Sequence, residues 1–136
     1  MTGKFTLIAE TEFATLDWGR VAALCSPSNT GAKNLTLLDG KLFPGKGHDF
    51  HKHANQEEVI LVVSGKIEQW IEQEKRILGP GDSVFVPPNT VHASFNAGDS
   101  EAHIIAIFGP SVGENGLEMI DMSGEAHWSE LRKKSA

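Results

Sequence analysis

Four residues of this chain have the types and the spacing to bind one metal ion, namely His51, His53, Glu58 and His92. His51 and His53 are separated by one residue, and side chains two apart in a β-strand project from the same face. Their Cα atoms would lie roughly 6.6 Å apart, at about 3.3 Å per residue, so two imidazoles could reach one ion at about 2.1 Å each. A carboxylate soon afterwards and a third histidine from a later strand would complete the group. The spacing therefore predicts a mononuclear metal site.

The choice of carboxylate depends on the residues that follow the second histidine. An unbroken strand from His53 would place Glu57 on the ligand face and Glu58 on the opposite face. Residues 54–56 (Ala-Asn-Gln) also form a plausible turn or bulge, and one extra residue there would reset the alternation in favour of Glu58. We expect Glu58 to be the ligand and keep Glu57 as the alternative.

Three imidazoles and one carboxylate form a mixed nitrogen and oxygen set. Such a set suits a divalent transition metal, namely Fe, Mn, Ni, Zn or Cu. A structural zinc site more often recruits thiolates, and the lone Cys25 lies outside the group. A divalent ion in this position would polarise a carbonyl or enol oxygen and lower the pKa of bound water.

The elements that must position these residues are short β-strands punctuated by glycine and proline, a pattern typical of an all-β sandwich or barrel. The predicted strands are residues 17–25, 35–43, 57–65, 66–72, two short strands within 76–89, 91–96 and 101–110. Residues 26–34 are expected to be a loop, and residues 1–16 an edge strand or an arm on a neighbouring subunit. The tail is predicted to carry a short helix at 124–134, with Trp128 and Leu131 on one face.

Alternation along the strands also indicates which polar residues line a pocket beside the metal. Ser94 shares a face with His92, and Gln69 points to one face of its strand, so both are predicted pocket residues. His103 is a further candidate on the last strand, although alternation does not settle its direction. His48 is expected outside the group of metal ligands, because its three-residue offset from His51 places it on the opposite face.

Composition excludes some partners and leaves others open. The net charge is −6, and lysine and arginine form no basic stripe, so we expect no nucleic-acid partner. No apolar run is long enough to cross a membrane, and the first residues do not resemble a secretory signal. Cys25 is the only cysteine, so no intrachain disulfide is expected. A cytoplasmic location is the default expectation.

Two motifs around the candidate ligands resemble those of the cupin superfamily, small metal-binding β-barrels. The first motif is matched by Gly45, His51, His53, Glu58 and Gly65. The second is matched by Gly81, Pro87, Asn89 in place of the usual glycine, His92 and Asn96. Asparagine is the residue that best replaces glycine where a positive φ is needed, so the departure at Asn89 is mild. The six-residue spacing from Gly65 selects Glu58.

The resemblance implies a jelly-roll β-barrel (double-stranded β-helix) with a short C-terminal tail, as a single domain over residues 1–136 whose barrel core spans about 35–110. Within the superfamily such a site supports dioxygenases, isomerases, decarboxylases and lyases, and it also occurs in small proteins with no established reaction. We expect an oxygenase or isomerase that acts on a small oxygen-rich substrate such as a diketone, an enol or a sugar acid. The alternative is a non-catalytic metal or small-ligand binding module. A polar cavity would favour the enzyme, and a narrow, wholly apolar cavity the module.

A homodimer is the expected assembly. The strand at 57–65 is apolar on both faces, and one barrel buries only one of them, so Val59, Leu61 and Val63 need another cover. Trp70 and Phe95 are expected to add aromatic area to the same outer face. Small cupins commonly pair through a sheet face, which favours a second copy over cover by residues 1–16 of the same chain.

Overall fold

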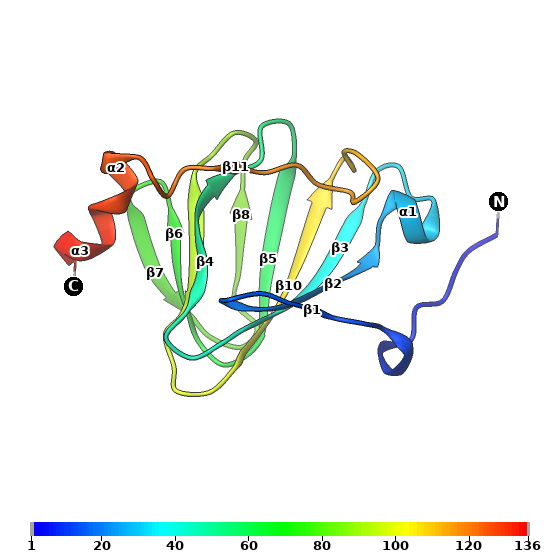
Figure 1. Ribbon diagram of the computed structural model, residues 1–136, viewed down its shortest axis with the longest axis horizontal. Coiled ribbons are helices and arrows are strands. Elements are labelled where there is room, and N and C mark those ends of the chain that lie inside the picture. The colour runs from blue at the N-terminus through cyan, green and yellow to red at the C-terminus, as the bar shows by residue number, and fades with distance from the viewer. Residues whose placement is uncertain (1, 136) are drawn as a thin grey trace.

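The computed structural model describes residues 2–135, which form two antiparallel sheets and four short helices (Figure 1). The six-stranded sheet has the order β1 (Ala14–Thr15), β2 (Gly19–Cys25), β3 (Thr36–Leu42), β10 (Ala102–Gly109), β5 (Glu57–Ser64) and β8 (Ser83–Val86). The five-stranded sheet has the order β11 (Ile120–Asp121), β4 (Gly47–Lys52), β9 (His92–Asn96), β6 (Ile67–Ile71) and β7 (Glu74–Leu78). The helices are η1 (Ile8–Glu10), α1 (Pro27–Thr30), α2 (Ala126–Ser129) and α3 (Leu131–Ser135). The predicted all-β jelly-roll with a short C-terminal helix is confirmed.

The segment predicted to be a loop at residues 26–34 contains one turn of helix, α1. Pro27 occupies the first turn, where its missing N–H is not needed, and Gly31 ends the helix at a φ of 77°. The Asn29 side chain accepts a hydrogen bond from the backbone N–H of Ser26 at 2.8 Å. These local signals form a helix too short to show any apolar period.

Strand β5 alternates strictly between the interior and the outer surface. Ile60 and Val62 are buried, at 3% and 1% exposed, and they pack into the main apolar core with Leu42, Ile67 and Phe108. The outward set is half-exposed and continuous with residues of the neighbouring strands β10 and β8 through the pairs Val59–Ile107 and Val59–Phe85. This outer patch consists of Val59, Leu61, Val63, Phe85 and Ile107.

Trp70 and Phe95 do not join this outer patch, and the expectation that they would is wrong. Both are buried, at 2% and 7% exposed, in β6 and β9 of the other sheet. The C-terminal tail covers them: Trp128 belongs to the same apolar cluster, and the Arg132 guanidinium lies 3.7 Å from the centroid of the Phe95 ring. The tail covers the outward face of β9 while its other face lies in the interior, so every residue of this strand is buried.

Candidate metal centre

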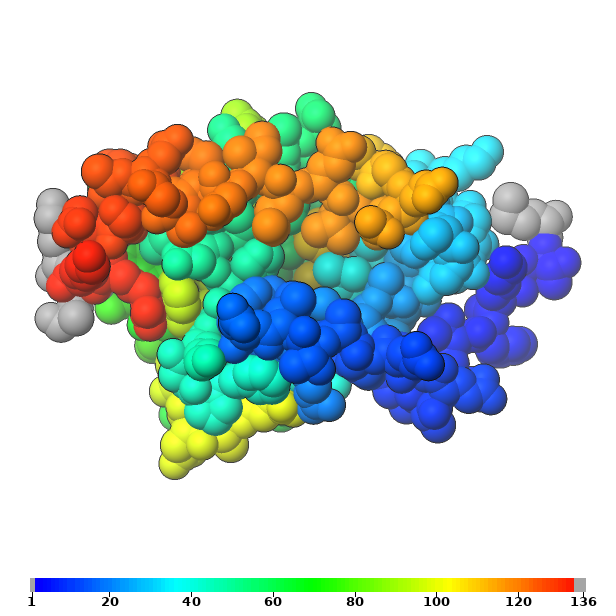
Figure 2. Space-filling model, in the orientation of Figure 1, coloured from blue at the N-terminus to red at the C-terminus, as the bar shows by residue number. Residues whose placement is uncertain are grey.

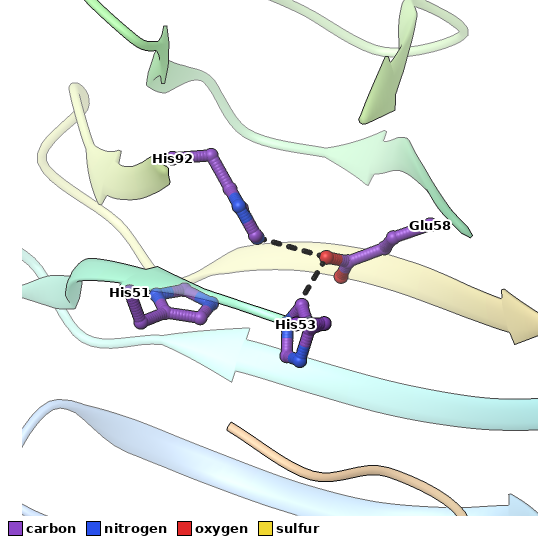
Figure 3. A group of neighbouring side chains, drawn as sticks. All are labelled: His51, His53, Glu58 and His92. Atoms are coloured by element: carbon purple, nitrogen blue, oxygen red, sulfur yellow. Dashed lines mark ion pairs between the residues drawn. The ribbon is translucent and has the colours of Figure 1, made fainter. Parts of the chain in front are cut away.

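Three strands from the two facing sheets bring the four predicted ligands to one point (Figure 3). His51 lies in β4 directly opposite His92, the first residue of β9, and His53 follows the end of β4. Glu58 projects inward from β5 in the facing sheet. The potential ligand atoms all lie within 4.8 Å of one another, and each of the four residues is at most 5% exposed.

The turn after His53 decides between the two candidate carboxylates. Ala54 and Asn55 form a turn between β4 and β5, which shifts the alternation as a bulge would. Glu58 is therefore buried beside the histidines, whereas Glu57 is exposed. The tight turn before β9 also contributes, because Asn89 adopts a φ of 60° and its N–H donates to the carbonyl oxygen of His53 at 2.8 Å.

Each of the three imidazoles is held by a backbone carbonyl at its Nδ1 atom. The pairs are His51 with Asp49 at 2.6 Å, His53 with Glu118 at 2.8 Å and His92 with Thr90 at 2.9 Å. A carbonyl oxygen only accepts, so Nδ1 carries the hydrogen in each ring and Nε2 keeps its lone pair. Histidines that bind metals typically donate the N–H of their other ring nitrogen to a carbonyl or carboxylate oxygen in this way, and that hydrogen bond fixes the tautomer.

Three buried atoms in the group lack a well-formed hydrogen bond among the described residues: Nε2 of His53, Nε2 of His92 and Oε1 of Glu58. The two nitrogens lie 3.3 and 2.9 Å from that oxygen. Buried polar atoms without hydrogen bonds are rare, and a cation shared by all three would satisfy them. The residues therefore fit a transition-metal ion by burial, donor type and direction.

Burial and mutual contacts shift the pKa values of the group in opposite directions. Burial acts to raise the pKa of Glu58, but the contacts with His53 and His92 outweigh it and lower that pKa to about 2. Burial likewise opposes the charged form of His53, yet Glu58 raises the pKa of His53 above its ordinary value. Desolvation lowers the pKa of His51 well below its ordinary value. Of these, His53 is the group that keeps a proton nearest to neutral pH.

This proton makes metal binding dependent on pH. A metal ligand must be a neutral imidazole, so a proton on His53 competes with the ion, whereas Glu58 stays ionised throughout. We expect zinc affinity to be level above the raised pKa of His53 and to fall about tenfold per pH unit below it. Competition with a chromophoric chelator between about pH 8 and about pH 5.5 measures this slope. An affinity that stays level over this range would contradict the assignment of His53.

The predicted pocket residues occupy three different positions. Ser94 lines the large cavity beside the cluster, and its hydroxyl donates to Oε1 of Gln69 at 2.6 Å. Gln69 is buried behind Ser94 and reaches a smaller cavity of about 250 Å³ instead. His103 lines neither cavity, because its strand turns Ile104 and Ala106 inward, and its Nε2 lies 2.8 Å from Oδ2 of Asp39.

His48 is not one of the four converging side chains, but its ring lies beside them, so the expectation that it points to the opposite face is wrong. Its ring stacks on His51 with 3.7 Å between centroids and on Trp18 with 4.7 Å. The pairing of β4 with β9 shifts register between His48 and His51, and this irregularity turns both side chains to one side. The sequence feature that could have indicated this irregularity is Asp49. Its carboxylate accepts a hydrogen bond from the backbone N–H of Phe50 at 2.8 Å, and such a local bond competes with regular strand pairing.

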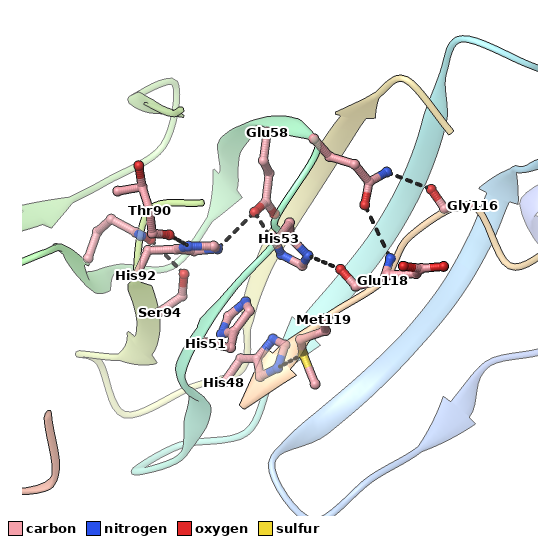
Figure 4. Close-up of polar contacts among 12 residues, drawn as sticks. His48, His51, His53, Glu58, Thr90, His92, Ser94, Gly116, Glu118 and Met119 are labelled. Atoms are coloured by element: carbon pink, nitrogen blue, oxygen red, sulfur yellow. Dashed lines mark hydrogen bonds and ion pairs between the residues drawn. The ribbon is translucent and has the colours of Figure 1, made fainter. Parts of the chain in front are cut away.

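A second missed contribution comes from the C-terminal strap, residues 110–121, which crosses the molecule in orange in Figure 1. Its Glu118 carbonyl oxygen accepts a hydrogen bond from Nδ1 of His53 (Figure 4). Leu117 and Met119 line the large cavity. Gln56, which was expected only to form a turn, anchors this strap. Its amide donates to the carbonyl oxygens of Pro110 at 2.7 Å and Gly116 at 2.9 Å, and its Oε1 accepts from the Glu118 N–H at 3.2 Å.

The large cavity has a volume of about 650 Å³ and lies between the two sheets, with the four candidate ligands in its wall. Its outer part is bordered by residues before β2 and by the C-terminal strap, which cross the same face of the molecule in blue and orange in Figure 2. Small-molecule sites in proteins typically measure about 300–1,000 Å³. The cavity therefore has room for a small organic ligand beside a bound ion.

Comparison with protein-family profiles matches residues 39–108, just over half of the chain, to the cupin domain. The chain belongs to the cupin family. Among curated proteins, this cupin is 28% identical to Protein SchB of Streptomyces halstedii over 103 residues, which cover 76% of this chain and 75% of SchB. It is also 26% identical to Polyketide synthase CurC of Streptomyces cyaneus, over 79% of this chain and 70% of CurC.

Solved structures share the fold of this cupin. KdgF from a Halomonas species superposes with a TM-score of 0.73 and 24% identity, over 82% of this chain and 96% of KdgF. Oxalate decarboxylase from Bacillus subtilis superposes with a TM-score of 0.72 and 20% identity, over 85% of this chain and 31% of that longer chain. Among the described residues no helix is long and apolar enough to span a membrane.

Proposed function

We propose that this cupin is a metal-dependent enzyme of the oxygenase or isomerase type, which binds one divalent transition-metal ion through His51, His53, Glu58 and His92. The substrate is a small organic molecule that reaches the ion through its oxygen atoms. One observation carries the proposal: three buried donor atoms without hydrogen bonds meet in the wall of a cavity of about 650 Å³.

The residues around the ion have separate tasks in this proposal. A divalent ion supplies the polarisation of a carbonyl or enol oxygen. Glu58 offsets one of its two positive charges, and the backbone carbonyls at the three Nδ1 atoms hold the imidazoles in place. The apolar walls exclude water, which strengthens every electrostatic interaction inside the cavity.

The names of similar proteins support an enzyme without choosing its reaction. One relative is named a polyketide synthase, and one structural neighbour is an oxalate decarboxylase whose Mn(II) centres have been studied. Both names refer to chemistry on oxygen-bearing carbon compounds. A shared fold hosts many reactions, so the reaction of this cupin must be found by assay.

The test begins with elemental analysis of protein purified without an affinity-tag metal. Oxygen-uptake and isomerisation assays then follow over a panel of β-diketones, enols and sugar acids. The proposal predicts about one transition-metal ion per chain and turnover of at least one compound, which is lost after chelation and restored by the same metal. Protein that binds no metal, or metal-loaded protein without turnover on the whole panel, would contradict it.

A non-catalytic binding module is the second candidate. It is favoured by the scarcity of further acid or base groups, since His48 and the exposed Glu12 are the only other titratable side chains among the described residues that line the cavity. The width of the cavity argues against a binding module that closes tightly over the ion. Its walls, however, are more apolar than we expected for an enzyme, which favours the module. Metal binding and ligand binding without turnover would identify the module. A cytoplasmic location stays a prediction.

We also propose that the outer patch is a homodimer interface. Its five residues are between 36% and 51% exposed and contiguous across three strands, and such patches usually mark contacts with another protein. Light scattering at micromolar concentration should give twice the chain mass, and Leu61→Lys should give the monomer mass. Ile77→Lys, an exposed position on β7 in the other sheet, is the control that should remain dimeric. A monomeric wild-type protein would contradict the proposal.

A further inference from the structure

The polar groups of the large cavity are confined to two places. The polar side chains near the candidate metal are His48, His51, His53, Glu58, His92 and Ser94. The remaining polar lining residues are Glu12, Ser28 and Asn115, which are exposed, and Ser26, whose hydroxyl lies 3.0 Å from Oδ1 of Asn29. The rest of the lining is apolar, including Leu38, Leu42, Ile60, Ile104 and Phe108. A ligand therefore meets polar atoms at its ends and hydrocarbon along its length.

Most polar atoms beside the metal cluster already have partners within the protein. The Nδ1–H groups of the three imidazoles donate to backbone carbonyls, and the Ser94 hydroxyl donates to Gln69. Nε2 of His48 lies 3.1 Å from Sδ of Met119. The atoms left without partners are those that face the ion. The ion is consequently the main polar anchor that this part of the cavity offers to a ligand.

The cavity also lacks a cationic side chain. No lysine or arginine is found among the described residues that line it. A carboxylate held against the apolar walls would lose its water and gain no opposite charge, and an unpaired buried charge is strongly disfavoured. A sugar acid or a dicarboxylate would need such a partner, or hydroxyl-binding groups along the walls. The walls offer neither.

We propose that the ligand of this site is a molecule with an uncharged, largely apolar body and one chelating pair of oxygens, such as an enolisable β-diketone on an aromatic or hydrocarbon frame. This inference rests on the proposed metal centre and narrows its substrate class. The oxygen pair binds the ion as a singly charged enolate. Its negative charge balances the one positive charge of the divalent ion that Glu58 does not offset. The apolar frame lies against the walls formed by β3, β5 and β10.

The test uses three probes with the same β-diketone head and different bodies, and one sugar acid as a polar comparison. Titration calorimetry on zinc-loaded protein measures binding of benzoylacetone, acetylacetone, para-carboxybenzoylacetone and galacturonate, since zinc has no redox chemistry. Benzoylacetone should bind at least about tenfold more tightly than the short acetylacetone, because its ring adds buried apolar area. It should exceed the carboxylated probe and galacturonate by a similar factor, because their charge is unpaired in the cavity.

A variant tests whether the walls cause this preference. Leu117→Lys places a cation in the lining and should narrow or invert the preference between benzoylacetone and its carboxylated form. Leu35→Lys is the matched control, since Leu35 is 58% exposed and does not line the cavity. Thermal unfolding of both variants establishes that they fold. If Leu117→Lys is unfolded, the wild-type ranking of the four probes still decides the proposal.

The outcomes separate this inference from the proposed function. Equal or tighter binding of para-carboxybenzoylacetone or galacturonate to the zinc-loaded protein would overturn the apolar ligand class and leave the metal centre standing. Zinc-loaded protein that binds none of the four probes also overturns the inference. Protein that takes up no zinc overturns the metal centre and the inference together. The expected ranking, with loss of benzoylacetone binding after zinc is removed, supports both.

Discussion

Replacing His92 with alanine is expected to reduce the bound metal from about one ion per chain to nearly none. His92 is fully buried, and its Nε2 lies 2.9 Å from the Glu58 oxygen at the centre of the cluster. The substitution removes one of four candidate protein ligands, and the group contains no fifth ligand among the described residues that could replace it. Changes to groups that only hydrogen-bond to a ligand typically cost about 10–100-fold in affinity, so losing the ligand itself should cost more. Mass-spectrometric metal analysis measures the effect.

Two matched comparisons make this result specific. His127→Ala removes an exposed histidine of the tail whose Nε2 contacts Gln73, and metal content should be unchanged. Glu58→Gln should lose metal, whereas Glu57→Gln at the neighbouring exposed position should retain it. Retention of a full metal complement by Glu58→Gln together with its loss by Glu57→Gln would reverse the assignment of the carboxylate.

Removal of the metal by chelation should lower the melting temperature without unfolding the protein at room temperature. An ion that binds only the folded state adds about 4 kcal/mol of stability when its free concentration is a thousand times its Kd. This gain corresponds to a shift of roughly 10 °C or more for a chain of this size. The chain retains a metal-independent apolar core built on Leu42, Ile60, Val62, Ile67 and Phe108. The β-type circular dichroism spectrum should therefore survive chelation.

The two ways in which this prediction can fail have different meanings. Complete unfolding after chelation would show that the apolar core does not support the fold by itself. An unchanged melting temperature, measured with and without a saturating metal, would show that the cluster does not bind the ion in the folded state. Thermal scans of His92→Ala provide the control, because added metal should no longer raise its melting temperature.

The strands and the convergence of the four ligand candidates were predictable from the sequence because both depend on local rules. Glycine and proline mark the turns, and β5 shows its alternation directly in the burial of Glu58, Ile60 and Val62. The expected opposite-face position of His48 was wrong because a bulge in β4 breaks the alternation, and a bulge has only a weak signature in one sequence. Trp70 and Phe95 were misplaced because their cover comes from residues more than thirty positions later.

The contacts made by Gln56 and by the Glu118 carbonyl oxygen were also unpredictable, because they join residues far apart in the sequence. A buried glutamine anchors a strap 54 to 62 residues away, and no local period indicates that partnership. The sequence identified the residues that could bind a metal. It did not identify the residues that hold them in position.

We expect the strap to link the binding of a metal ion to the occupancy of the cavity. A molecule inside the cavity touches Leu117 and Met119, and the carbonyl oxygen of the residue between them holds His53 by its Nδ1–H. Binding free energies obey reciprocity, so a ligand that favours the metal-loaded protein by some factor must tighten the metal by that same factor. These three consecutive residues would then couple the two binding equilibria, and the spectrum of a coloured ion such as Co(II) at the four ligands should change when the cavity is filled.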